Sequence, residues 1–96
     1  MFKKVSIKPI ELEYVQFTYE FRDQVLSEVR ETQNNVYHSW DTLGKPCIII
    51  PNVNGEQVCH IGDYVIKHPN PKDWCKFMCC SSTVFKSLMN MFGKEV

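Results

Sequence analysis

The chain has 96 residues and balances eleven Lys and Arg against eleven Asp and Glu, so its formal net charge is zero. This length predicts one domain, residues 1–96, and the neutral charge excludes a protein steered as a whole toward nucleic acid or an anionic membrane. Hydrophobic residues make up 44% of the chain and aromatic residues 12%, which favours a globular core over a disordered chain.

Cysteine usage and hydropathy predict an intracellular protein. In the basic start "MFKKVSIKPI", polar residues and Pro9 interrupt the chain before any apolar run that could act as an export signal. No apolar run is longer than Cys47 to Ile50, far short of the ~20 residues of a membrane-spanning helix. Five cysteines, an odd number, favour reduced thiols in a cytoplasm over a disulfide framework.

The first third of the chain predicts a strand and then a helix. Residues 5–17 alternate between apolar and polar side chains, and Pro9 offsets the alternation by one step. We therefore predict one strand, with Pro9 at its edge or at a bulge. From Thr18, the candidate N-cap, the period changes to that of an amphipathic helix that ends near "TQNN", residues 32–35. Its apolar positions are Phe21, Val25 and Val29.

The middle holds the clearest pattern, "IIIPNVNGEQVCHIGDYVIK", residues 48–67. It predicts a strand over 47–50, a type I′ turn at Asn54-Gly55 and a partner strand over 57–61. Gly62-Asp63 predicts a second turn or bulge, because Gly permits the kink and Asp caps turn amides, and a strand over 64–67 follows. Before this hairpin we expect a short strand over 36–40 and a loop over 41–46.

The last third predicts a loop, a strand and a helix. The segment "HPNPKD", residues 68–73, has two prolines and is expected to be a loop. The alternating "WCKFMCC" that follows suits a strand covered on both faces. Ser81 or Ser82 is the candidate cap of a helix that stops at Gly93. Its predicted apolar stripe consists of Val84, Phe85, Leu88, Met91 and Phe92.

This order of elements predicts an α+β fold. We expect a small antiparallel sheet, one helix after the first strand and one C-terminal helix. The Met and Phe residues of the last helix are core residues by default, and any that stay exposed would make an association surface, for instance in a homo-oligomer.

Cysteine and histidine offer enough potential ligands for zinc, but their spacing is poor. Zinc sites usually pair ligands two to four residues apart on turns, whereas neighbours on a strand point to opposite faces. We therefore interpret the cysteines as small buried hydrophobes, assign no metal ligands and keep a small zinc-binding module as an alternative. The residues in question are Cys59, His60, Cys75, Cys79, Cys80, His38 and His68.

The chain lacks the motifs of known catalytic sites. It has neither a G-x-S-x-G elbow nor a glycine-rich phosphate loop, and Glu11 and Glu13 suit the solvated side of a strand. We predict that the protein is not an enzyme and has no catalytic residue and no cofactor.

Basic residues fall into two groups that are distant in sequence. If the fold brings them together near Tyr64 and Trp74, they would form a surface for base stacking and phosphate binding, which suits a nucleotide ligand. The groups are Lys3, Lys4 and Lys8, and Lys67, Lys72 and Lys76.

The order and spacing of three segments resemble a group of small bacteriophage proteins of unassigned activity. The group's opening strand has the pattern V-x-x-V-Q-[WF]-T, its hairpin leads into G-D-[YW]-[IV]-[IV]-K, and its closing strand reaches a turn around x-x-x-F. The matching residues are Leu12, Val15, Gln16, Phe17 and Thr18, then Gly62, Asp63, Tyr64, Val65, Ile66 and Lys67, then Val84 and Phe85. The match extends from Lys8 to about Met89, with Leu12 in place of the first Val. The chain departs from the group in "HPNPKD", where the group has a glycine and another hairpin, and in its longer last helix.

The resemblance implies an accessory protein of a phage that acts in the cytoplasm of an infected bacterium, with no membrane partner. Together with the missing catalytic motifs, it leads to the hypothesis of a non-enzymatic phage protein that binds and inhibits a bacterial host protein, an antiphage defence component. The alternative is a sponge that sequesters a nucleotide immune signal. The predicted partner-binding residues are Trp74, Lys72, Tyr64, His68 and Phe92.

Overall fold

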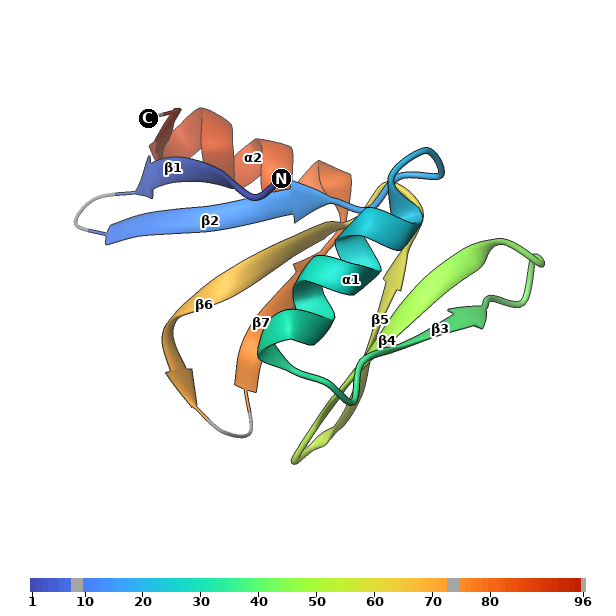
Figure 1. The fold of residues 1–96 in the computed structure, drawn as a ribbon. Helices are drawn as coiled ribbons and strands as arrows, with labels where there is room; N and C mark the ends of the chain where they lie inside the picture. The colour runs from blue at the N-terminus through green and yellow to red at the C-terminus, as the bar shows by residue number, and fades with distance from the viewer. Residues whose placement is uncertain (8–9, 73–74, 96) are drawn as a thin grey trace.

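In the part of the chain that the structure describes, two antiparallel sheets and two helices form the fold (Figure 1). This computed structural model describes the backbone of residues 1–7, 10–72 and 75–95, and their side chains except those of 7, 10–11, 69–72, 75 and 91–95. The five-stranded sheet has the order β7 (Cys75–Cys80), β6 (Tyr64–Lys72), β2 (Ile10–Gln16), β1 (Lys3–Ile7) and β8 (Gly93–Glu95). The three-stranded sheet has the order β3 (Tyr37–Trp40), β4 (Pro46–Asn52) and β5 (Gly55–His60). The helices are α1 (Arg22–Thr32) and α2 (Ser82–Phe92), so the predicted α+β fold is confirmed.

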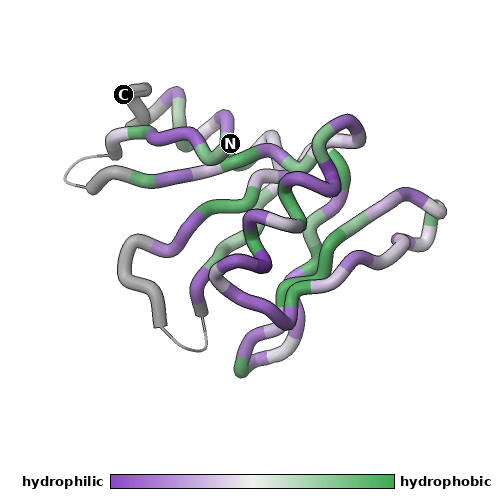
Figure 2. The backbone as a smooth tube through the Cα atoms, viewed as in Figure 1, coloured by the Kyte–Doolittle hydropathy of each residue, from purple (hydrophilic) through white to green (hydrophobic). Residues whose placement is uncertain are grey.

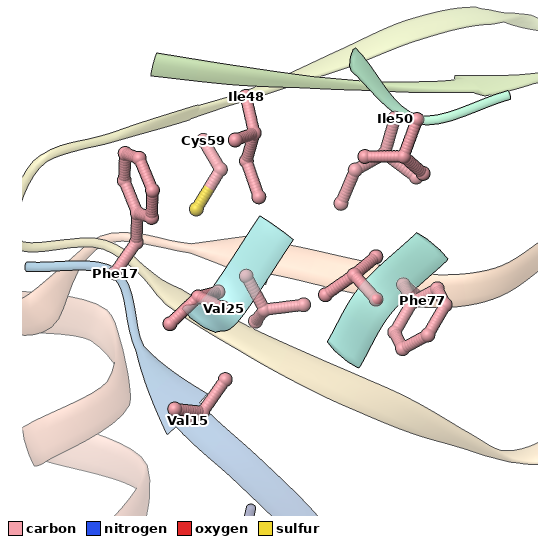
Figure 3. Packing of buried hydrophobic residues seen from close by; sticks show 10 residues of the cluster. Val15, Phe17, Val25, Ile48, Ile50, Cys59 and Phe77 are labelled. Carbon is pink, nitrogen blue, oxygen red and sulfur yellow. The ribbon is translucent and has the colours of Figure 1, made fainter. Parts of the chain in front are cut away.

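The five-stranded sheet is covered on both faces. One face packs against α1 and the three-stranded sheet and forms the main core, shown in Figure 3. The other face packs against α2 and forms a second core. The main core contains Val15, Phe17, Val25, Val29, Val36, Ile48, Ile50, Cys59, Val65 and Phe77, and the second contains Val5, Leu12, Ile66 and Phe85.

Side-chain alternation along the strands explains this division, because neighbouring residues of a strand point to opposite faces. On β6, Val65 belongs to the main core and Ile66 to the second. On β7, Phe77 and Cys79 pack in the main core, whereas Met78 and Cys80 pack in the second. The prediction that this last strand is covered on both faces is therefore confirmed.

One glutamine side chain connects the two sheets. Gln57 of β5 donates from Nε2 to the Phe77 carbonyl of β7 at 2.8 Å and accepts from the Cys79 amide at Oε1 at 3.0 Å. The amide group thus bridges two strands that do not pair directly. Beside it, a hydrogen bond between the Cys59 and Cys79 thiols, together with burial, strongly raises the pKa of Cys59.

The prediction of one strand over residues 5–17 is wrong. The chain reverses there into the hairpin of β1 and β2, in which Val5 pairs with Leu12 and Ile7 with Ile10. Pro9 lies outside the described residues. A hairpin of this kind preserves alternation on both strands, so the pattern alone does not reveal the reversal.

The first helix begins later than predicted, at Arg22. Thr18 is not its N-cap, although its Oγ1 accepts a hydrogen bond from the Phe21 amide at 3.3 Å in the preceding turn. Phe21 is 40% exposed, and Phe17, just after β2, is fully buried instead. The buried stripe of α1 consists of Val25 and Val29, as predicted.

Of the two predicted turns, the second is confirmed. Gly62 has a φ of 95°, and Asp63 accepts a hydrogen bond from the His60 amide at 2.9 Å through its carboxylate. The first turn lies one residue earlier than predicted, because Asn52 pairs with Gly55 and the turn comprises 53–54. Gly55 has a φ of 128°, but Asn54 has a negative φ, so a type I′ turn centred on Asn54-Gly55 is wrong.

The structure places residues 68–72 in β6, so the prediction of a loop over "HPNPKD" is wrong for these residues. The pairing with β7 shifts between Lys67 and Lys72, which lets a proline-containing segment continue the strand irregularly. Asp73 lies outside the described residues.

The predicted start and end of α2 are confirmed, but its predicted stripe is partly wrong. Ser81 caps the helix, since its Oγ accepts from the Val84 amide at 3.3 Å, and Gly93 follows its last residue. The packed face carries Phe85, 5% exposed, and Met89. Val84 and Leu88 are 51% and 39% exposed, because they lie about 100° around the helix from this face.

Candidate functional site

The three-stranded sheet carries an apolar face that points away from both cores. Its core side holds Ile48, Ile50 and Cys59 and faces α1 and the five-stranded sheet (Figures 1 and 3). By alternation, the opposite side holds the cross-strand row Tyr37, Ile49 and Val58. We call this side the outer face, defined by Tyr37, Ser39, Cys47, Ile49, Val58 and His60.

The centre of the outer face is tightly packed and its margin is exposed. Ile49 is 8% exposed and Cys47 2%, although neither belongs to the main or the second core. Their neighbours Tyr37 and Val58 are 45% and 42% exposed, and Val53 in the turn between β4 and β5 is 71% exposed. Figure 2 shows the run of hydrophobic residues in β4 on which this face is built. An apolar centre with exposed aromatic and aliphatic side chains around it is typical of a protein interface.

Polar contacts fix the rim of the outer face. The Tyr37 hydroxyl donates to Glu56 Oε2 at 2.7 Å, which raises the pKa of Tyr37 and holds its ring in place. At the other end, His60 Nδ1 lies 3.3 Å from Asp41 Oδ2. This pair lines a surface pocket of about 350 Å³ with Lys45 and the β3–β4 loop.

Asp41 is held in place by the loop that it opens. Its Oδ1 accepts hydrogen bonds from the amides of Leu43 and Lys45, both at 2.9 Å. The backbone hydrogen bond from Lys45 is the largest cause that lowers the pKa of Asp41, and His60 adds to it. The arrangement orients one histidine beside one carboxylate. The thiol opposite His60, that of Cys47, is 2% exposed and its pKa is raised by burial, so the pair suits polar contacts at an interface rim.

Exposed aromatic side chains continue along the edge of the sheet. Trp40, the last residue of β3, is 63% exposed and forms an edge-to-face contact with the His38 ring at 4.9 Å between centroids. Leu43, in the loop that follows, is 79% exposed. Exposed Trp and Tyr are over-represented among the residues that dominate binding energy at interfaces.

The residues predicted from sequence to bind a partner lie elsewhere. Tyr64 packs in the second core, where its ring stacks on Phe85. His68 is half-buried on β6. The structure describes Lys72 and Phe92 by backbone alone, at the ends of β6 and α2, and Trp74 lies outside the described residues.

Tyr64 also lines a small pocket of about 160 Å³ together with Lys3, Tyr14, Gln16 and Phe85. The fold thus brings one lysine of the N-terminal group beside an aromatic cluster. Lys67, from the second group, points to the opposite face, with its Nζ 3.6 Å from Glu13 Oε1 and 4.6 Å from the centre of the Phe2 ring. The pairing therefore separates Lys3 and Lys67 to opposite faces of the sheet.

No metal centre is formed by the described residues, which contain no group of three His, Cys, Asp or Glu side chains close enough to share an ion. Cys59 and Cys79 meet as hydrogen-bonded thiols, and Cys80 points to the second core. Within the same described residues, neither helix is long and apolar enough to cross a bilayer.

Sequence reasoning missed the outer face. Tyr37 and Val58 are 21 positions apart, and only the strand register places them on either side of Ile49. The signal that could have revealed the exposed edge is the segment "YHSWDTLG", in which a Trp ends a short strand before a polar loop.

Comparisons of the chain with protein-family models, with curated proteins and with solved structures give no match.

Proposed function

We propose that this protein is a non-enzymatic phage protein that binds a bacterial host protein, an antiphage defence component, in the host cytoplasm and inhibits it through the outer face. The observation that carries the proposal is the exposure of Tyr37 and Val58 beside the packed Ile49 and Cys47. These side chains offer an apolar surface to a partner, since the protein's own core lies on the other side of the sheet.

The composition of this face supports a protein partner. A tyrosine held by Glu56 provides a rigid, amphipathic anchor that loses little rotamer freedom on binding. The rim residues Glu56, Asp41 and His60 provide charged and polar contacts that select the partner and fix its orientation. The resemblance to small phage proteins without catalytic motifs supports the choice of a host target.

A matched pair of exposed valines tests the site. Val58→Asp puts a carboxylate on the outer face beside Ile49, whereas Val84→Asp puts one on the exposed side of α2. Each variant and the wild type is expressed in bacterial strains that carry individual defence systems, and the plating efficiency of a phage without this protein is measured. We expect the wild type and Val84→Asp to restore plating in one strain, and Val58→Asp to lose this effect.

The same three proteins, purified from that strain, identify the interaction. Native mass spectrometry is expected to show the defence component bound to the wild type and to Val84→Asp but not to Val58→Asp. Equal retention by the two variants contradicts the outer face as the site. Restored plating without any bound host protein contradicts inhibition by binding.

The pocket of Lys3, Tyr14, Gln16, Tyr64 and Phe85 favours a second candidate function, the sequestration of a nucleotide. It combines one cationic group with aromatic side chains, which is the chemistry of phosphate binding and base stacking. A nucleotide that binds, added in excess, raises the unfolding temperature. We expect Lys3→Gln to reduce this shift and the control Lys86→Gln, on α2, to leave it unchanged. No shift across a panel of mono-, di- and cyclic nucleotides contradicts this candidate.

A further inference from the structure

The pairing of β3 with β4 shows which backbone groups face the open edge of the sheet. The Asp41 amide donates to the Lys45 carbonyl at 2.9 Å, so this pair, just beyond the strands, is hydrogen-bonded. Hydrogen-bonded and non-bonded pairs alternate along antiparallel strands. The next pair, Trp40 with Pro46, is therefore non-bonded, which agrees with the missing N–H of proline. The N–H and C=O groups of Trp40, and of His38 two residues earlier, consequently point away from β4.

Among the described strands, β3 is the edge with the least protection against pairing. The other edge of its sheet, β5, faces β7, to which Gln57 bonds. In the five-stranded sheet, the edge strand β8 has the sequence "GKE", with two charged residues. The sequence of β3, "YHSW", contains neither Lys, Arg, Asp or Glu nor proline. Charges and prolines are the usual means by which edge strands avoid pairing with another chain.

We propose that two copies of this chain pair antiparallel through β3 across a two-fold axis at Ser39, which joins their three-stranded sheets. In this register His38 lies opposite the partner's Trp40, and Trp40 lies opposite the partner's His38. Each opposed pair is then a hydrogen-bonded pair, so the outward N–H and C=O groups of both residues are satisfied in both copies. The same segment, β3, forms the interface in both copies, as a two-fold axis requires.

The side chains support a second copy as the occupant of this edge. His38 and Trp40 point to the same face of β3 and already contact each other at 4.9 Å between ring centroids. The proposed register puts the same two rings of the second copy directly beside them, which covers a Trp that is 63% exposed in one chain. The outer face is on the other side of the strand, so pairing leaves Tyr37 accessible and makes the two outer faces continuous. The proposal is independent of the proposed host target.

Sedimentation velocity of the purified full chain tests the association. We expect a dimer of twice the chain mass of 11.3 kDa. Trp40→Lys, which adds a charge and removes the largest ring, is expected to weaken dimerisation by at least about tenfold. The control Tyr19→Lys changes an aromatic residue that is 54% exposed in the turn before α1, and it is expected to dimerise like the wild type.

Amide hydrogen exchange tests the register. In the proposed dimer the amides of His38 and Trp40 are hydrogen-bonded and exchange slowly, whereas in Trp40→Lys both are expected to exchange rapidly. The amide of Ser39 faces β4 and stays protected in both proteins, which shows that the variant is folded. If the wild type stays monomeric at concentrations up to about 1 mM, the proposal is overturned, because even a weak dimer is populated at that concentration. A dimer in which His38 and Trp40 stay unprotected overturns it equally, because the interface is then elsewhere.

Discussion

The rings of Tyr64 and Phe85 stack with their centroids 3.9 Å apart and their planes 8° from parallel. Tyr14 contacts the same Phe85 ring, with centroids 4.8 Å apart. One phenylalanine of α2 therefore sits against two tyrosines that come from the neighbouring strands β2 and β6. This aromatic contact holds α2 on the five-stranded sheet.

Replacing Phe85 by alanine is expected to lower the free energy of unfolding by about 3–5 kcal/mol, because a large side chain that is 5% exposed leaves a cavity between the tyrosines. Urea unfolding followed by fluorescence measures the change. Leu88→Ala on the exposed side of the same helix is the control, and less than about 1 kcal/mol is expected there. If the two variants lose equal stability, α2 is not held by this contact.

Replacing Gln57 by alanine is expected to lower the free energy of unfolding by about 1–2 kcal/mol. The change removes both hydrogen bonds between β5 and β7 and leaves the Phe77 carbonyl and the Cys79 amide without their partner. Gln24→Ala on the exposed side of α1 controls for the loss of a glutamine. An unchanged urea midpoint for Gln57→Ala would show that the sheets stay joined by apolar packing alone.

The lowered pKa of Asp41 predicts how stability depends on pH. Because its pKa in the folded protein is below the ordinary value of 3.8, the unfolded chain binds more protons between these two values. The contribution of Asp41 is therefore complete above pH 3.8 and is lost as the pH falls through the folded pKa.

Asp41→Asn isolates this contribution, since the asparagine oxygen can still accept from the amides of Leu43 and Lys45. Urea midpoints between pH 5 and about pH 2 are expected to fall less steeply for Asp41→Asn than for the wild type. Identical slopes for the wild type and Asp41→Asn contradict a role of this carboxylate.

Local patterns sufficed for parts of the fold in which neighbours in sequence decide the structure. The alternation in "CKFMCC" predicts a strand covered on both faces. Gly62-Asp63 predicts a turn, because Gly62 has the backbone freedom for a positive φ and the carboxylate of Asp63 accepts a backbone amide. The capping hydroxyl of Ser81 likewise acts on an amide three residues away. The turn and the cap depend on contacts within a short segment, whereas the elements that cover the strand are distant in sequence and only its alternation is local.

The predictions that failed depend on contacts between distant segments. Alternation over residues 5–17 fits one strand or a hairpin, and only the pairing of Val5 with Leu12 distinguishes them. The stacking of Tyr64 on Phe85 could not be predicted either, because α2 returns from far along the chain to pack on β6. The outer face was missed for the same reason, because strand register decides which side of β4 the core occupies.

The thiols of Cys47 and Cys59 are expected to resist alkylation in the native protein. They are 2% and 0% exposed, and burial raises the pKa of Cys47, while the hydrogen bond to Cys79 and burial raise that of Cys59, so little reactive thiolate forms at neutral pH. Mass spectrometry of peptides after brief iodoacetamide treatment measures each thiol, with protein in urea as the fully reactive reference.

The Phe85→Ala variant shows how Cys59 becomes reactive. If alkylation requires global unfolding, a loss of about 3 kcal/mol speeds the reaction of Cys59 by about 100-fold, whereas Leu88→Ala leaves its rate nearly unchanged. Equal rates in wild type and Phe85→Ala mean instead that Cys59 is exposed by local separation of β5 from β7. In that case Gln57→Ala, which removes the bridge between these strands, is the variant that speeds the reaction.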